Sequence, residues 1–230
     1  MRLLLIRHGE TTANAGRILD TAPPGHSLTD LGRRQAEGLV PRLDGLPVGA
    51  IYASDLVRTQ QTAAPLAAQR GIEVQVHPDG REISGGALEG ATHDEAFEQY
   101  AHTVFSWGDV RHRGTRLAGG ESGHEVLDRF DRQLARAADA VTGLGDAAVV
   151  VAHGAIIRIW TSCRALGADA SFIAGHPMPN TGIVELQGDP RQGWTLVTYD
   201  GLSAADIADG IDDARADELA RDERQESFGG

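Results

Sequence analysis

Four short, mostly apolar runs divide the first two thirds of the chain, and residues typical of turns or helix caps bound each of them. They lie at residues 3–6, 48–53, 72–76 and 147–152. Apolar runs of this length are typical of strands that are buried on both faces of a parallel sheet. We therefore expect four buried strands at these positions.

Helical periodicity fills the segments between these runs. One predicted helix begins after Thr29 or Asp30, either of which can cap its N-terminus. A longer one begins at Ser122 and Glu125, which have the spacing of a capping box. The apolar faces consist of Leu31, Leu39, Val40 and Leu43 in the first helix, and Val126, Phe130, Leu134, Ala137, Ala138 and Val141 in the second. Strands that alternate with helices predict an α/β fold, a three-layer sandwich with a mostly parallel central sheet and helices on both faces.

Three further segments complete the predicted domain organisation. Residues 182–186 and 194–199, joined by a turn rich in Gly and Pro, predict a hairpin-like edge of the sheet. Residues 91–120 interrupt the alternation with aromatic, arginine and histidine side chains, and we expect them to form an inserted lid. Residues 203–230 carry nine acidic residues against three arginines and predict an acidic C-terminal tail, either a surface helix or a disordered extension. Residues 1–202, which include the hairpin and the inserted lid, are expected to form one catalytic domain.

Composition excludes several classes of protein. The net charge of −12 argues against nucleic acid or an anionic membrane as the main partner, and no apolar stretch approaches the roughly 20 residues that a membrane-spanning helix needs. All 21 basic residues are arginine, which excludes mechanisms that use a lysine. The single cysteine, Cys163, excludes an internal disulfide, and the histidines have no paired metal-ligand spacing. We expect a soluble, cytoplasmic protein without a metal site or organic cofactor; its oligomeric state is not predicted.

Residues with catalytic chemistry follow each predicted strand. The first strand ends in Arg7-His8-Gly9, the second in Ser54-Asp55 with Arg58 one turn later, the third leads to Arg81-Glu82, and the fourth ends in His153-Gly154. Because the carboxyl ends of parallel strands line the ligand crevice of such sheets, these residues are expected to gather at one rim.

This set of residues is suited to phosphoryl transfer through a covalent phosphohistidine. Arginine binds a phosphate dianion well through forked hydrogen bonds. A neutral imidazole can attack phosphorus when its other nitrogen is held in one tautomer, and a carboxylic acid can protonate the departing alcohol. We expect Arg7, Arg58 and His153 to stabilise charge on the transferred phosphoryl group.

The motifs, taken in order, resemble those of a known family. They are Arg7-His8-Gly9-Glu10-Thr11 with Asn14, Ser27-Leu28-Thr29, Gly32 with Gln35-Ala36, Ser54-Asp55 with Arg58 and Thr62-Ala63, Arg81-Glu82 with Glu89-Gly90, Gly119-Gly120-Glu121-Ser122, and Ala152-His153-Gly154. Over about residues 2–186 the chain resembles the histidine phosphatase superfamily, in the branch that includes cofactor-dependent phosphoglycerate mutases and fructose-2,6-bisphosphatases.

The resemblance implies a role for each matched residue. His8 is expected to be the phosphorylated nucleophile and Glu82 the proton donor, with Arg7, Arg58 and His153 completing the phosphate pocket. Further candidate substrate contacts are Asn14, the Gly154 backbone and Thr21. Thr21 belongs to a segment, residues 20–24, that replaces the short segment usual in the family. Glu89 and Glu95 are nearby carboxylates that could take the acid role instead of Glu82.

The expected activity is hydrolysis of a small phosphomonoester metabolite without a metal. Mutases of the family carry a longer segment after the proton donor, which is missing between Glu82 and Gly119, so a phosphatase is favoured. Two alternatives stay open: a phosphoglycerate mutase dependent on 2,3-bisphosphoglycerate, and a non-catalytic module that binds a phosphorylated ligand or a protein. Arg111, Arg113 and Arg116 are expected to be either solvated surface or, for one of them, a contact to a second anionic group.

Overall fold

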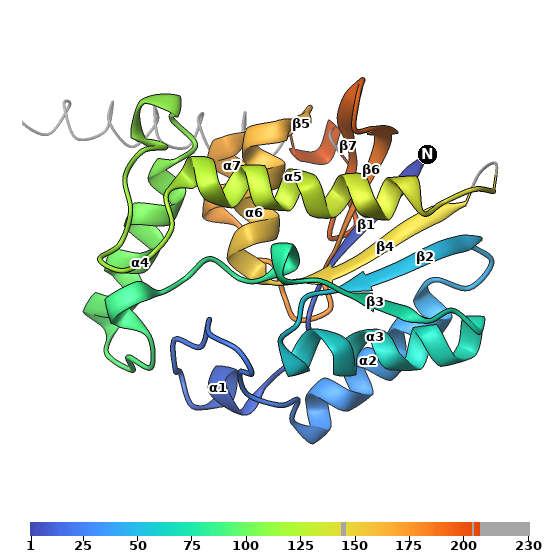
Figure 1. The fold of residues 1–230 in the computed structure, drawn as a ribbon, viewed down its shortest axis with the longest axis horizontal. Coiled ribbons are helices and arrows are strands. Elements are labelled where there is room, and N and C mark those ends of the chain that lie inside the picture. The colour runs from blue at the N-terminus through green and yellow to red at the C-terminus, as the bar shows by residue number, and fades with distance from the viewer. Residues whose placement is uncertain (144–145, 204, 208–230) are drawn as a thin grey trace, which may run out of the picture.

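The computed structural model describes residues 1–143, 146–203 and 205–207, which are organised around one eight-stranded sheet (Figure 1). Its strands are β1 (Arg2–Arg7), β2 (Val48–Ala53), β3 (Val74–Val76), β4 (Ala147–Ala152), β5 (Ala165–Leu166), β6 (Ile183–Asp189), β7 (Gly193–Tyr199) and β8 (Leu202–Ser203). The strand order is β3-β2-β4-β1-β6-β7-β5, with β8 paired to β7. Neighbouring strands from β3 to β1 are parallel, whereas β6 is antiparallel to both β1 and β7. The four predicted strands are thus β1 to β4, and the predicted hairpin is β6–β7. The expectation that all four are buried is wrong for β3, which lies at the edge of the sheet and leaves Val76 46% exposed.

Helices cover both faces of this sheet. They are α1 (Thr12–Ala15), α2 (Asp30–Arg42), α3 (Val57–Arg70), α4 (Asp94–Ser106), α5 (Gly123–Asp139), α6 (Gly154–Arg164) and α7 (Ala170–Gly175), with short 3-10 turns at Pro78–Gly80, Gly86–Leu88 and Val110–His112. In Figure 1, α2 and α3 lie on one side of the sheet, and α5 and α6 lie on the other. The predicted three-layer α/β architecture is therefore confirmed.

Alternate residues of the central strands fill two separate cores. In β1, Leu3 and Leu5 pack in the larger core beneath α5 and α6, whereas Leu4 and Ile6 pack in the smaller core against α2 and α3. All six residues of β4 are buried. Burial on both faces is the physical reason that these strands have continuous apolar runs rather than alternating ones.

The predicted helix starts are observed, and one predicted strand is shorter than expected. The Thr29 side chain, rather than that of Asp30, caps α2 by accepting from Gly32 N–H, and Ser122 and Glu125 form the capping box of α5. The third strand begins only at Val74, because the Ile72 N–H donates to Ala67 O at the end of α3.

The segment predicted as an inserted lid is anchored in the larger core. It forms α4 and the turn that follows, and within it Val104 and Trp107 are fully buried. The Trp107 indole N–H donates to Thr115, which ties the turn to the helix. The segment is thus a packed wall of the domain.

Little of the predicted tail can be compared with the structure. Of residues 203–230, only 203 and 205–207 lie among those described, and there Ile207 is buried against the larger core. No helix in the described ranges combines the length and the apolar character that crossing a membrane requires.

Candidate active site

Two histidines lie side by side at the carboxyl ends of the central strands. His8 follows β1 and His153 follows β4, and these strands are parallel neighbours in which Arg7 is level with Ala152. The two rings are therefore 5.3 Å apart between centroids, and both side chains are buried. This is the rim predicted from the residues that end each apolar run.

His8 is held in one tautomer. Its Nδ1 is 2.7 Å from the carbonyl oxygen of Gly9. Because a carbonyl oxygen only accepts hydrogen bonds, Nδ1 must carry the ring proton, which places the lone pair on Nε2. Burial, together with the adjacent charges of Arg58 and Arg7, keeps the pKa of His8 well below its usual value. The lowered pKa favours the neutral ring at physiological pH.

Both ring nitrogens of His153 are engaged by protein groups. Arg58 Nε donates to Nδ1 at 3.2 Å, and Nε2 lies 2.8 Å from Ser54 Oγ. Burial, with the charge of Arg58 next, lowers the pKa of His153 well below its usual value, in keeping with a neutral ring that accepts at Nδ1. In this arrangement the His153 ring contacts Arg58 and Ser54. That His153 stabilises the phosphoryl group itself stays a prediction.

Arg58 is buried and makes a second set of bonds to Asp20. Its NH1 donates to Asp20 Oδ2 at 3.0 Å and its NH2 to the Asp20 carbonyl at 2.9 Å. Sequence reasoning noted that the 20–24 segment is unusual but did not assign Asp20 a role. The contact fixes the guanidinium at the edge of the cavity and offsets part of its charge.

Arg7 brings a buried donor into the site. Its NH1 donates to the Met178 carbonyl, while its Nε is buried and has no hydrogen-bond partner among the described residues. The side chain lies on Gly154, where a Cβ would be only 3.2 Å from Nε. A side chain at this position would therefore push the Arg7 guanidinium by a few tenths of an ångström. An anion bound beside Gly154 would supply the acceptor that Nε lacks.

The Glu82 carboxylate lies at the N-terminus of α6. Its Oε1 accepts from the backbone N–H groups of Ile83 and Ile156, both at 2.9 Å, and its Oε2 accepts from Ala155 N–H at 3.0 Å. Backbone N–H groups at a helix N-terminus bind an acidic side chain through hydrogen bonds and attract it through the helix dipole. Glu82 is thereby held on the lining of the same cavity as His8.

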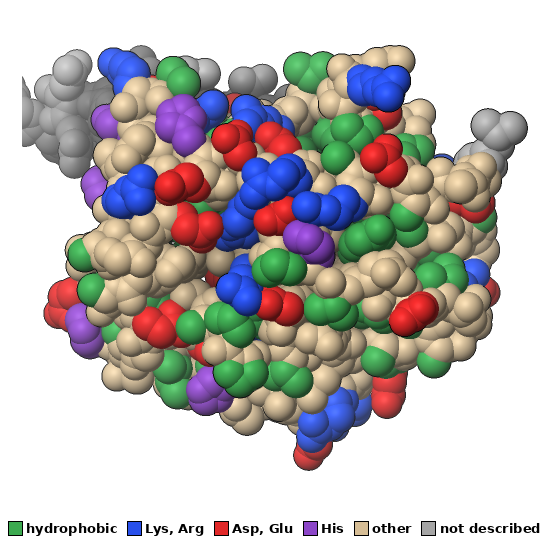
Figure 2. Space-filling model, in the orientation of Figure 1, with side chains coloured by type: hydrophobic (Ala, Val, Ile, Leu, Met, Phe, Trp, Pro, Cys, Tyr) green, Lys and Arg blue, Asp and Glu red, His purple; other side chains and the backbone are tan. Residues whose placement is uncertain are grey.

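Arg129 of α5 fixes the backbone of the Glu82 segment. It is only 8% exposed, and it donates to the carbonyls of Asp79, Arg81 and Glu82 at 2.8–3.0 Å. Glu121 accepts from its Nε at 2.6 Å and from its NH2 at 3.0 Å. In the orientation of Figure 1, in which α5 crosses the middle of the view, Figure 2 shows arginine and acidic side chains interleaved over this part of the surface. We name the pair of Arg129 and Glu121 the anchor pair.

The two alternative carboxylates do not line the cavity of His8. Glu89 accepts from the backbone N–H groups of Thr21 and Ala22 and from the Thr21 hydroxyl, so it holds the 20–22 segment in place. Glu95 is exposed and lies beside His93. Of the three acidic candidates, only Glu82 lines that cavity.

The candidate substrate contacts differ in how they are held. Thr21 lines the cavity, but its hydroxyl is already bound to Glu89 and Gly85 N–H. Asn14 also lines the cavity, and its Oδ1 accepts from Thr11 N–H at 3.1 Å in the cap of α1. Asn180, which the sequence did not single out, donates to the His8 carbonyl at 3.0 Å.

The cavity that contains these groups has a volume of about 360 Å³. Its lining brings together the predicted Arg7, His8, Asn14, Thr21, Arg58, Glu82 and Gly154, and also includes Asp20 and Arg158. None of the three arginines from the predicted lid lines it. Arg111 pairs with Asp109, Arg113 donates to the Trp107 carbonyl, and Arg116 pairs with Glu125. The hypothesis that one of them contacts a second anion therefore has no support in this geometry.

Arg158 was not predicted as a site residue, although its position in the sequence indicates that it lies near the site. It lies one helical turn after Gly154 on α6, so it is on the same side of the helix as the predicted site. Its Nε and NH2 donate to the Ile173 carbonyl, and its guanidinium lies over the Phe105 ring.

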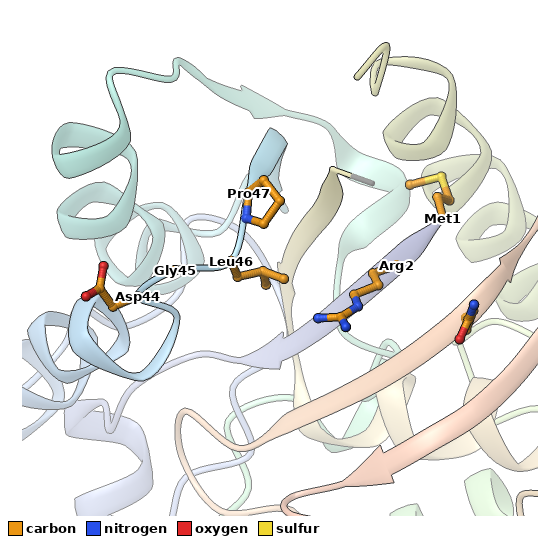
Figure 3. Close-up of a pocket in the computed structure, with 7 residues that line it drawn as sticks. Met1, Arg2, Asp44, Gly45, Leu46 and Pro47 are labelled. Carbon is orange, nitrogen blue, oxygen red and sulfur yellow. The ribbon is translucent and has the colours of Figure 1, made fainter. Parts of the chain in front are cut away.

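A larger hollow lies far from this chemistry, at the opposite ends of the strands. It has a volume of about 790 Å³ and is lined by Met1, Arg2, residues 44–47 and Gln187 (Figure 3). Arg2 is its one cationic side chain, and this lies 3.6 Å from Glu185. This lining contains no histidine or other nucleophile. The candidate site is therefore identified by the chemistry of its side chains and not by the volume of its cavity.

Comparisons with known proteins agree with this geometry. The model of the histidine phosphatase superfamily (branch 1) matches residues 3–201. The "Probable phosphoglycerate mutase GpmB" of Erwinia tasmaniensis is 30% identical over 96% of this chain and 100% of its own length. The PE-PGRS family protein PE_PGRS11 of Mycobacterium tuberculosis is 34% identical over 86% of this chain, which spans 36% of that longer protein.

Solved structures of phosphatases are also similar to this chain. The mycobacterial glucosyl-3-phosphoglycerate phosphatase in complex with VO3 superposes with a TM-score of 0.72 at 27% identity, over 86% of this chain and 98% of that one. The match of the family model over nearly the whole chain confirms the resemblance predicted from the motifs. The chain belongs to branch 1 of the histidine phosphatase superfamily and is a phosphoric monoester hydrolase of that type.

Proposed function

We propose that this chain is a metal-independent phosphatase that hydrolyses a small phosphomonoester through a phosphohistidine at His8 Nε2. The single observation that carries the proposal is the fixed tautomer of His8, whose Nδ1 is bound to Gly9 O while Arg58 is held at the edge of the same cavity. The predicted cytoplasmic location is part of the proposal.

In the first step, the Nε2 lone pair forms a bond to phosphorus as the bond from phosphorus to the ester oxygen breaks. The departing oxygen takes a proton from the carboxylic acid of Glu82 and leaves as the alcohol. The imidazole becomes cationic, and its Nδ1–H continues to donate to the Gly9 carbonyl, which stabilises that charge. Arg7 and Arg58 bind the oxygens of the phosphoryl group.

In the second step, water attacks phosphorus and the N–P bond breaks. The Glu82 carboxylate takes the proton from water, and the electrons of the N–P bond return to Nε2 as a lone pair. Phosphate leaves, and both His8 and Glu82 are back in their starting forms. Two arginines supply the positive charge that a metal supplies in other phosphatases, which supports the metal-independent reading.

The test is a rapid acid-free quench of the enzyme with a ³²P-labelled phosphomonoester. We expect a protein-bound label that is stable in alkali and labile in acid, as a phosphoramidate is, and that is absent from His8→Ala. Label transferred to 3-phosphoglycerate, with little free phosphate, would instead identify a mutase. Binding of the ester to wild type without label or phosphate release would identify a non-catalytic binding module.

A further inference from the structure

The cavity is lined by two chemically different sets of side chains. One set is charged and includes His8's neighbours Arg7, Arg58 and Glu82. The other set is apolar: Ile18, Leu19, Phe97, Ala101, Phe105 and Met178. We name these six residues the apolar vestibule.

Helix α4 builds one wall of the vestibule. Phe97, Ala101 and Phe105 recur at spacings of four residues, so they lie along one side of the helix. Each is half-buried, whereas Val104 on the same helix is fully buried in the core. One part of the apolar surface of α4 is therefore buried in the core, and another part lines the cavity.

Two polar side chains that lie beside the vestibule, Tyr100 and Arg158, make hydrogen bonds to protein carbonyls. The Tyr100 hydroxyl donates to the Ile83 carbonyl at 2.9 Å, so its ring is what remains to line the cavity. Arg158 donates twice to the Ile173 carbonyl and lies 4.3 Å from the centre of the Phe105 ring. A leaving alcohol with several hydroxyls would place groups that need hydrogen bonds against the carbon of the vestibule, which is unfavourable.

We propose that the preferred substrates are phosphomonoesters whose alcohol carries an apolar, preferably aromatic, body that packs in the vestibule. This inference rests on the proposed function and adds the substrate class. Partly exposed aromatic side chains beside a preorganised polar centre are typical of small-molecule sites, and a cavity of about 360 Å³ is within their usual range of volume. A ring packed along the side of α4 that carries Phe97 and Phe105 gains apolar burial and ring contacts.

The first test compares primary alkyl phosphates, whose alcohols have similar acidity, so that leaving-group chemistry does not decide the outcome. They are 2-phenylethyl, hexyl and ethyl phosphate, glycerol 1-phosphate and 3-phosphoglycerate. We expect kcat/KM for 2-phenylethyl phosphate to exceed that for glycerol 1-phosphate by about 10- to 100-fold, as burial of a ring predicts. Equal values, or a preference for glycerol 1-phosphate or 3-phosphoglycerate, overturn the inference.

The second test uses variants of the wall. Phe97→Ala and Phe105→Ala should each reduce the ratio of kcat/KM for 2-phenylethyl over ethyl phosphate by about 10-fold, and Phe97→Leu, which keeps most of the apolar bulk, by less. The control is Val110→Ala, because Val110 is exposed and follows α4 without lining the cavity. An unchanged ratio in both alanine variants contradicts the proposal.

A binding measurement separates this inference from the proposed function. Calorimetric titration with 2-phenylethylphosphonate and with a dihydroxypropyl phosphonate needs no turnover. If the phenyl compound binds at least about 10-fold more tightly while no ester releases phosphate, the vestibule stands and the phosphatase proposal fails. If phosphate is released but the two phosphonates bind equally, the phosphatase stands and the vestibule fails.

Discussion

The anchor pair gives the sharpest test of how this fold positions Glu82, the proposed acid. In Arg129→Met, three backbone carbonyls lose their donor, among them that of Glu82, and Glu121 loses its charged partner and keeps only the bond from Ser84 N–H among the described contacts. Removing one member of a fully buried ion pair costs about 3–5 kcal/mol. Because the Glu121 side chain is 29% exposed, water replaces part of the lost interaction, and we expect about 2–4 kcal/mol.

A matched control lies on the same helix. Arg132 also pairs with a residue of this segment, Asp79, but its side chain is 57% exposed. Surface pairs of this kind contribute at most about 1 kcal/mol, so Arg132→Met should be nearly neutral. Urea unfolding of the two variants beside wild type gives both free energies of unfolding.

Activity should show the same contrast. A shift of the Glu82 segment by about 1 Å is enough to cost about 100-fold in a positioned catalytic step. We therefore expect Arg129→Met to lose about 10- to 100-fold in kcat/KM on an alkyl phosphate. On para-nitrophenyl phosphate, whose leaving group barely needs a proton, the loss should be only a few-fold.

Two outcomes would refute this reasoning. One is an equal loss on both substrates, which would mean that Arg129 does not act through the acid. The other is additivity with Glu82→Gln: once the carboxylic acid is gone, Arg129→Met should cost little more on the alkyl ester. Should Arg129→Met fail to fold, Glu121→Gln, which keeps a hydrogen-bond acceptor for Arg129, provides the milder perturbation for the same two assays.

The other predictions concern Glu82, the glycine beside Arg7, the two histidines and metals. Glu82→Gln should lower kcat/KM on alkyl phosphates by about 10²–10⁴-fold but spare para-nitrophenyl phosphate, and equal losses would remove the acid assignment. Gly154→Ala, whose new Cβ would be 3.2 Å from a guanidinium nitrogen, should raise KM, whereas Gly38→Ala, with no atom within 4 Å, should stabilise the protein by about 0.5–1 kcal/mol in thermal unfolding. The pKa values of His8 and His153 are lowered on folding, so the unfolded chain binds more protons below pH about 6.5, and stability should fall there by up to about 1.4 kcal/mol per pH unit for each histidine. A flat urea midpoint between pH 5 and 6.5 would contradict this. EDTA should leave the rate of phosphate release unchanged, and strong inhibition would reopen the question of a metal.

The strand pattern could be predicted from the sequence because β1 and β4 are buried on both faces. Such burial leaves a run of apolar residues that ends abruptly in polar ones, and His8 and His153 stand at those two ends. Parallel pairing then fixes their proximity without any knowledge of side-chain contacts. The catalytic roles of His8 and Glu82 stay predictions, to which the geometry adds the tautomer of one and the backbone bonds of the other.

The remaining features could not be predicted because they depend on contacts between distant segments. Nothing local indicates that Asp20 binds Arg58, or that both nitrogens of His153 are already engaged. The segment at 91–120 has the composition of a surface insertion, yet Trp107 and Val104 are in the core because α4 has an apolar side that the larger core covers. Composition alone does not show which side of a helix is covered.

The order of strands in the sheet has a consequence for synthesis on the ribosome. β1 is the first strand to be made, but both of its neighbours, β4 and β6, begin at residue 147 or later. β2 can pair early with β3, whereas β1 stays unpaired on both edges while more than half of the chain emerges. An apolar strand with two open edges is prone to intermolecular pairing, so nascent chains shorter than about 150 residues should be those that depend on chaperones. Since His8 and His153 meet only when β4 inserts beside β1, the appearance of activity during translation would mark the moment at which the sheet closes.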